Sequence, residues 1–150
     1  MGFQLVTTKG QLTITLQKEV AHITEVMINT LQYVGNEAVK VARTSHKYKD
    51  QTGNLTSSIG YVLSVNGEII TMSDFNAVKG AVEGTIGDNG SKTGKELAMS
   101  LAQHSSGITL ILVAGMEYAT FVEAMGLNVL EAAKITAEKL LKNILNQLGI

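Results

Sequence analysis

Apolar residues recur along this chain with two different periods, and the places where the period changes divide it into elements. Near the N-terminus, apolar and polar residues alternate on either side of the sequence Thr-Lys-Gly. Alternation with a period of two is typical of half-buried strands, and a glycine suits the turn between them. The pattern predicts a short β-hairpin with these apolar positions: Phe3, Leu5, Leu12, Ile14 and Leu16.

Two long segments instead carry apolar residues at steps of three and four, the spacing of one helix face. The first runs over residues 16–46 and the other over residues 128–148. The latter segment is amphipathic, with Glu131, Lys134, Glu138 and Lys142 opposite its apolar stripe. We therefore expect a long N-terminal helix and a C-terminal amphipathic helix.

The middle of the chain predicts a second hairpin followed by a long loop. Asn66 and Gly67 stand between two apolar runs, and both residues tolerate the positive φ of a tight hairpin turn. Residues 73–94 contain five glycines and few large apolar groups, which indicates a long, mobile glycine-rich loop. Such a segment in a compact domain usually serves a function or orders on a partner, and we expect a partner here.

The remaining pattern predicts a short helix over residues 95–103, a buried strand over 108–113 and a helical turn or two over 117–125. Strands and helices do not alternate regularly, which favours the α+β class. We expect a small, mostly antiparallel sheet packed on one face by the two long helices, with the glycine-rich loop outside it. With 150 residues and no linker, residues 1–150 should form a single domain.

The amino-acid composition indicates which partners the protein could bind and in which compartment it is made. Apolar residues make up 45% of the chain and charged residues only 17%, which suggests that another protein covers part of the surface. A net charge of −1 argues against general DNA binding, and the absence of cysteine excludes disulfides and thiolate metal sites. No signal layout and no apolar run of about 20 residues is present, so we expect synthesis in a cytoplasm and no membrane contact.

The sequence contains no clear motif for catalysis, nucleotide binding or metal binding. Gly90-Ser-Lys-Thr has the residue types of a phosphate-binding loop in the wrong order. The three histidines are far apart, and no serine stands in a Gly-x-Ser-x-Gly elbow. We therefore predict no catalytic residue, no metal and no cofactor, and we expect that the protein is not an enzyme.

One basic cluster lies near the end of the first long helix and has two interpretations. Its cations could simply pair with the negative end of the helix dipole. Alternatively, they could face DNA in a channel or an acidic partner. The cluster consists of Lys40, Arg43, His46, Lys47 and Lys49.

Two segments together resemble the family of small neck proteins of long-tailed bacteriophages, also described as minor tail or tail-completion proteins. One segment resembles the family's pattern of an acidic residue, Thr-Gly, a leucine and a Ser-Ile pair: Asp50, Thr52, Gly53, Leu55, Ser58 and Ile59. The other is similar to its Tyr-Ala-x-aromatic-Val-Glu signature: Tyr118, Ala119, Phe121, Val122 and Glu123. This chain departs from the family in having Ala124 and Met125 between the glutamate and Gly126.

Local physics assigns most of these residues a packing role. Gly53 permits a left-handed turn, and the two following apolar residues of the motif should anchor the second hairpin to the core. Tyr118, Phe121 and Val122 should pack together as positions i, i+3 and i+4 of a helix. Packing does not explain Glu123, which we expect to pair with a neighbouring subunit.

The resemblance implies a structural virion protein at the head–tail junction, assembled in the bacterial host cytoplasm. It would form a cyclic homo-oligomeric ring, six- or twelvefold, that joins or seals the connector and lets DNA pass through its lumen. Portal, connector and tail proteins would be its partners, and residues 74–94 with the two termini would make the contacts between rings. The alternative is a small cytoplasmic regulatory or binding module that dimerises through the C-terminal helix.

Overall fold

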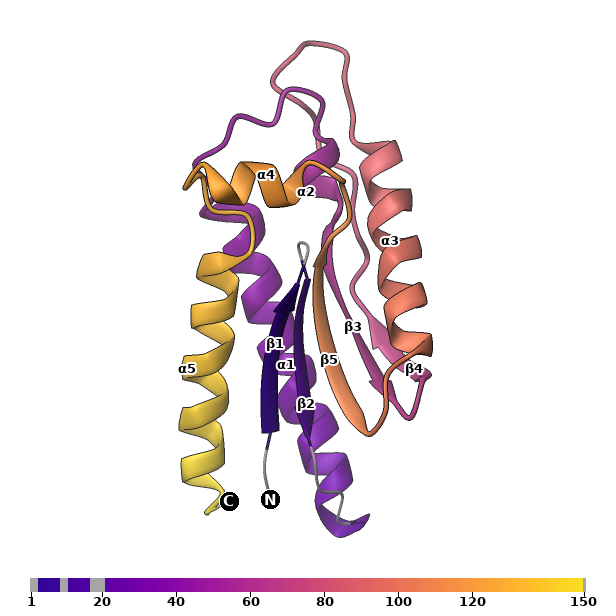
Figure 1. Ribbon diagram of the computed structural model, residues 1–150, viewed down its shortest axis with the longest axis vertical. Helices are drawn as coiled ribbons and strands as arrows, with labels where there is room; N and C mark the ends of the chain where they lie inside the picture. The colour runs from indigo at the N-terminus through magenta and orange to yellow at the C-terminus, as the bar shows by residue number, and fades with distance from the viewer. Residues whose placement is uncertain (1–2, 9–10, 17–20, 150) are drawn as a thin grey trace.

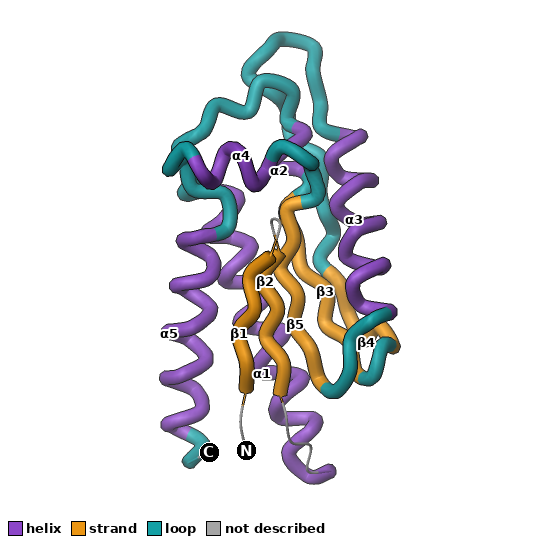
Figure 2. Tube along the Cα trace, in the orientation of Figure 1, coloured by secondary structure: helices purple, strands orange, loops and turns teal. Residues whose placement is uncertain are grey.

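In the computed structural model, which describes residues 3–8, 11–16 and 21–149, one sheet lies between helices (Figures 1 and 2). The elements follow the predicted order, with two hairpins separated by the first long helix and the C-terminal helix closing the chain. They are β1 (Phe3–Thr8), β2 (Gln11–Leu16), α1 (Ala21–Thr44), α2 (Asn54–Ser57), β3 (Ile59–Val65), β4 (Glu68–Met72), α3 (Asp88–Gln103), β5 (Ile108–Ala114), α4 (Ala119–Ala124) and α5 (Glu131–Gln147).

The sheet has five strands in the order β1-β2-β5-β3-β4, and every neighbouring pair is antiparallel. β5 is central, and all seven of its residues are buried. This explains its almost entirely apolar sequence, in which Thr109 is the one polar residue, because a strand covered on both faces has no solvent-facing side. The α+β prediction, with an antiparallel sheet and the two long helices, is confirmed.

The two hairpins also follow the sequence prediction. β1 pairs with β2, although the turn residues Lys9 and Gly10 lie outside the described residues. In the second hairpin Asn66 and Gly67 both have positive φ, 51° and 84°, as the Asn-Gly turn requires. The Asn66 side chain also accepts a hydrogen bond from the Gly107 N–H at 2.8 Å, which ties this turn to the start of β5.

The sheet is covered on both faces, and the expectation of helices on one face alone is wrong. On one face α1 and α5 pack over the larger core, which includes Leu31, Leu63, Leu110 and Leu141. On the other face α3 covers a smaller core that contains the fully buried Phe75. The sequence did not predict that α3 covers this second face, because the residues that α3 buries are small and contribute little to a hydrophobic pattern. These residues are Gly90, Gly94, Ala98 and Ala102.

The boundaries of the glycine-rich segment differ from the prediction. α3 begins at Asp88, so the connection after β4 is residues 73–87, and it contains one isolated bridge between Lys79 and Ile86. Glycine lowers helix propensity by about 1 kcal/mol relative to alanine, which made residues 88–94 look unstructured. These glycines instead allow backbones to touch. A β-carbon on Gly94 would lie 2.4 Å from the Ser58 carbonyl oxygen and 2.9 Å from the Phe75 ring.

The replacement Gly94→Ala should therefore lower the free energy of unfolding by about 1–3 kcal/mol, because the overpacked contact is with backbone and cannot rotate away. Chemical denaturation would measure this loss. Ser100→Ala, on the exposed face of the same helix, serves as the control and should change little. Equal or greater stability of Gly94→Ala would contradict the close approach.

Candidate interaction surface

The structure brings the two resemblance segments together at one end of the molecule, where α2 and α4 lie side by side at the top of Figure 1. Together they line a hollow of about 230 Å³, with Tyr48 and Leu55 on one side and Tyr118 and Val122 on the other. The Tyr118 side chain hydrogen-bonds to Thr52, and its pKa is raised, chiefly by burial. Positions more than sixty residues apart in the chain thus form one structural unit.

In the first segment, Asp50 holds the turn that starts α2. Its carboxylate accepts hydrogen bonds from the Gly53 N–H at 2.9 Å and from the Thr56 N–H at 2.7 Å. Gly53 has a φ of 83°, which confirms the predicted left-handed turn. Leu55 and Ile59 are buried as expected, so this segment anchors the second hairpin to the core.

Ser58, at the end of the same segment, donates a hydrogen bond from its hydroxyl to the Leu55 carbonyl at 2.7 Å. It is fully buried, and its backbone carbonyl accepts a hydrogen bond from the Gly115 N–H. The segment therefore also links α2 to the chain that leaves β5.

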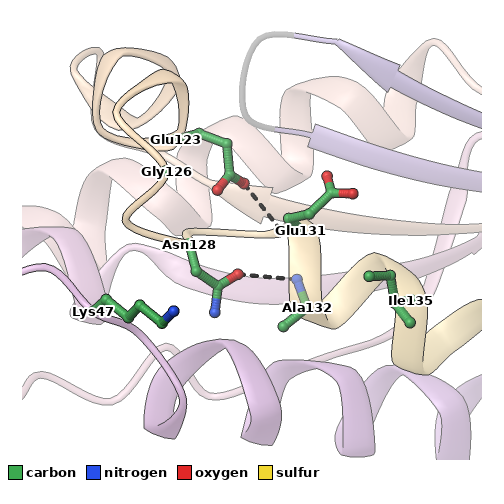
Figure 3. A pocket seen from close by; sticks show the side chains of 7 residues that line it. All are labelled: Lys47, Glu123, Gly126, Asn128, Glu131, Ala132 and Ile135. Atoms are coloured by element: carbon green, nitrogen blue, oxygen red, sulfur yellow. Dashed lines mark hydrogen bonds between the residues drawn. The ribbon is translucent and has the colours of Figure 1, made fainter.

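Glu123, at the end of α4, caps the N-terminus of α5 (Figure 3). Its two carboxylate oxygens accept hydrogen bonds from the N–H groups of Val129 at 2.7 Å, Leu130 at 2.7 Å and Glu131 at 3.0 Å. A negative charge at this position also interacts favourably with the helix dipole. Glu123 therefore has a structural role within its own chain, and its pairing with a neighbouring subunit stays a prediction.

Asn128 supports the same cap and was not singled out from the sequence. Its side-chain oxygen accepts a hydrogen bond from the Ala132 N–H at 2.9 Å, and its amide donates to the Ser45 carbonyl at 3.1 Å. Its φ of 57° is one that asparagine adopts more readily than most residues. The available signal was an asparagine just before the C-terminal apolar stripe, where helix caps concentrate.

The aromatic residues of α4 face outward, and the prediction that Tyr118 and Phe121 pack inward with Val122 is wrong. Tyr118 is 42% exposed and Phe121 68% exposed, whereas Ala119 is 1% exposed. Ala119, Val122 and Glu123 instead form the inward face at positions i, i+3 and i+4. The inward face therefore lies one residue later in the sequence than predicted. The outward face continues to Met125, which is 54% exposed.

Residues 73–87 run past the same end of the molecule as α2 and α4 (Figure 1). Val82 and Ile86 are about half exposed. This connection is tied to the segment before α2, because the N–H groups of Ala81 and Val82 donate to the carbonyls of Asp50 and Gln51. We call the following residues the apical surface: Val82, Ile86, Tyr118, Phe121 and Met125.

The basic cluster does not form one cationic face, because its members line three separate hollows. Arg43 is half-buried and donates hydrogen bonds to the carbonyls of Asn76 and Ile59, and its burial lowers the pKa of the guanidinium. Lys40 borders the same groove as Arg43. Lys47 lies beside the Glu123 cap, and Lys49 lies beside Tyr118. The guanidinium of Arg43 is thus used in hydrogen bonds within the chain, one of which fixes the segment after β4.

Tyr48 connects the end of α1 with α2. Its hydroxyl lies 3.0 Å from the Thr56 hydroxyl, and its ring stacks on His46 with the ring centroids 4.0 Å apart. Burial raises the pKa of Tyr48 to about 12. The phenol is therefore a neutral structural link rather than an ionisable group near neutral pH.

Among residues 24–149, whose side chains the structure describes, no three potential metal ligands gather in one place. Over the same range, every buried side-chain polar atom has a hydrogen-bond partner. A search of these residues also finds no helix with the length and apolarity to cross a membrane.

No family model matches the sequence, and no curated protein or solved structure is significantly similar to it.

Replacing Glu123 with glutamine should destabilise the protein by about 1–3 kcal/mol, because the amide keeps one acceptor oxygen for three N–H groups and loses the charge. Thermal and chemical denaturation would measure the loss. The matched control is Glu117→Gln, since Glu117 is exposed just before α4. An equal effect of both changes would argue against the cap.

The free energy of unfolding should also fall at alkaline pH because of Tyr48. Its pKa is about 12 in the folded protein against 10.0 ordinarily, so its contribution is fully present below pH 10 and is lost as pH rises through 12. After allowance for solvent screening the loss is roughly 1–2 kcal/mol. Denaturation across this pH range should show a shallower decline for Tyr48→Phe, while Tyr33→Phe, at a side chain that is 51% exposed, should retain the slope. Identical slopes for all three proteins would contradict the assignment.

Proposed function

We propose that the protein is a structural subunit of a long-tailed phage virion, one copy of a homo-oligomeric ring that joins or seals the head–tail connector. The observation that carries this proposal is the apical surface. It combines exposed apolar side chains in and next to α4 with two from residues 73–87, and both segments lie toward one end of the molecule (Figure 1). Apolar groups gathered in this way favour burial by another protein.

The arrangement of the resemblance segments supports the same function. Asp50 fixes the start of α2 and Glu123 fixes the junction between α4 and α5. The residues between these caps present Tyr118 and Phe121 outward. The two segments therefore build and hold a contact surface, which is the work expected of a subunit in a stacked connector.

In the proposed assembly the long axis of the molecule runs through the stack of rings. The strands run roughly along this axis, and the segments that carry the apical surface, α4 and residues 73–87, lie toward one end of it (Figure 1). Axial contacts with a portal, connector or tail protein would then use the apical surface. Lateral contacts between copies would use the sides of the sheet and helices, and DNA would pass through the lumen.

The alternative of a small regulatory module that dimerises through the C-terminal helix receives less support. The apolar stripe of α5 is buried within its own chain, where Ala133, Ala137, Leu141 and Leu145 belong to the core shared with α1. A dimer through that stripe would require α5 to leave the core. We therefore favour association through other surfaces.

The proposal is tested with the purified full chain, alone and mixed with phage portal and tail proteins. Light scattering and negative-stain electron microscopy should show rings or a complex with a connector component. A protein that stays monomeric and associates with none of these components would contradict the proposed function.

The double replacement of Phe121 and Met125 by serine should weaken association with the connector by about tenfold or more, because contact aromatics in the centre of an interface often contribute over 1 kcal/mol each. The stability of the monomer should change little, since both side chains are exposed. A pull-down titration would measure the affinity. The matched control is Val26→Ser with Met99→Ser, at two exposed apolar side chains outside the apical surface.

A further inference from the structure

Both edges of the sheet end in strands with one free side. β1 pairs only with β2 in the sheet, and β4 pairs only with β3. An edge strand turns unpaired N–H and C=O groups outward, and another strand can bind them. The two edges are similar in length, with six residues in β1 and five in β4.

The β4 edge has only part of the usual protection against strand pairing. Natural edges are guarded by charged side chains, by proline or by a bulge that twists the strand away. β4 carries one charge, Glu68 at its first position, and the chain contains no proline. A bulge is present, since Ser64 pairs with Ile69 and Leu63 with Thr71, which leaves Ile70 as the extra residue.

This bulge does not shield the strand with a polar group. Ile69 is 36% exposed and Ile70 is 47% exposed, so two adjacent isoleucines reach solvent at the edge. The β1 edge is similar in composition, because none of its residues is charged. The described residues thus place two nearly uncharged edge strands at opposite sides of one sheet.

The topology fixes the direction in which these edges could meet. Each of the four neighbouring pairs is antiparallel, so β1 and β4 run in the same direction. In a ring of more than a few subunits, adjacent copies differ by a small rotation, and β4 of one copy would meet β1 of the next as a parallel pair. A two-fold dimer would instead pair β4 with β4 in antiparallel fashion.

We propose that β4 binds β1 of a second copy in parallel, so that the sheet continues from subunit to subunit. The inference rests on the proposed ring and names its lateral contact. Head-to-tail pairing satisfies both edges of every interior copy, whereas a two-fold dimer through β4 leaves both β1 edges open. This strand addition supplies backbone hydrogen bonds, and the exposed isoleucines supply apolar contact.

Cysteine cross-linking distinguishes the two geometries, because the chain has no cysteine of its own. Ile70→Cys alone, Val6→Cys alone and the double variant would be treated with a short bis-maleimide at the highest soluble concentration and analysed on denaturing gels. Parallel pairing of β4 with β1 predicts a ladder of multimers for the double variant and monomers for each single variant. Dimers from Ile70→Cys alone, or monomers from the double variant, would overturn the proposal.

A second pair of variants tests the edge without cross-linking. Ile70→Lys places a charge on the β4 edge and should lower the assembled fraction at least tenfold in light scattering, with unchanged circular dichroism. Ile135→Lys is the matched control, since Ile135 on α5 is also 47% exposed. Equal assembly of both variants would overturn the proposal. If wild-type rings form while the double-cysteine variant gives no ladder, the strand pairing is wrong but the proposed function stands.

Discussion

The structure depends on the burial of its central strands from both sides. β5 is buried along its whole length and β3 along six of its seven residues. One side is closed by α1 and α5 through large aliphatic side chains, and the other by α3 through glycine and alanine. Because the small residues bring α3 within backbone contact of Ser58 and Asn54, the position of α2 is fixed by the same packing that closes the core.

Two carboxylates hold the elements next to the apical surface in place. Asp50 accepts hydrogen bonds at the start of α2, and Glu123 does so at the start of α5. Buried tyrosine and serine hydroxyls complete the links between these elements. The end of the molecule is therefore ordered by polar contacts within the chain, which leaves its apolar side chains free for partners.

Much of the fold follows from periodicity alone. The two hairpins, the long helix, the buried strand and the terminal helix all carry patterns of apolar residues strong enough to be recognised. The start of α3 was missed because Gly90 and Gly94 serve close packing, a tertiary requirement that opposes local helix propensity. The outward direction of Tyr118 and Phe121 was missed because a helix of six residues offers too few positions to fix which face is buried. Glu123 was noticed for lacking a packing role, but its partners lie six to eight residues later and become visible only in three dimensions.

The Glu123 cap has a consequence for the energetics of association. A surface presented by a loosely held helix would lose conformational freedom when a partner docks, and that loss would reduce the affinity. Here α4 is joined to the first turn of α5 by three hydrogen bonds before any partner arrives. The aromatic side chains are thus preorganised, so that most of the favourable free energy of covering them remains available as affinity.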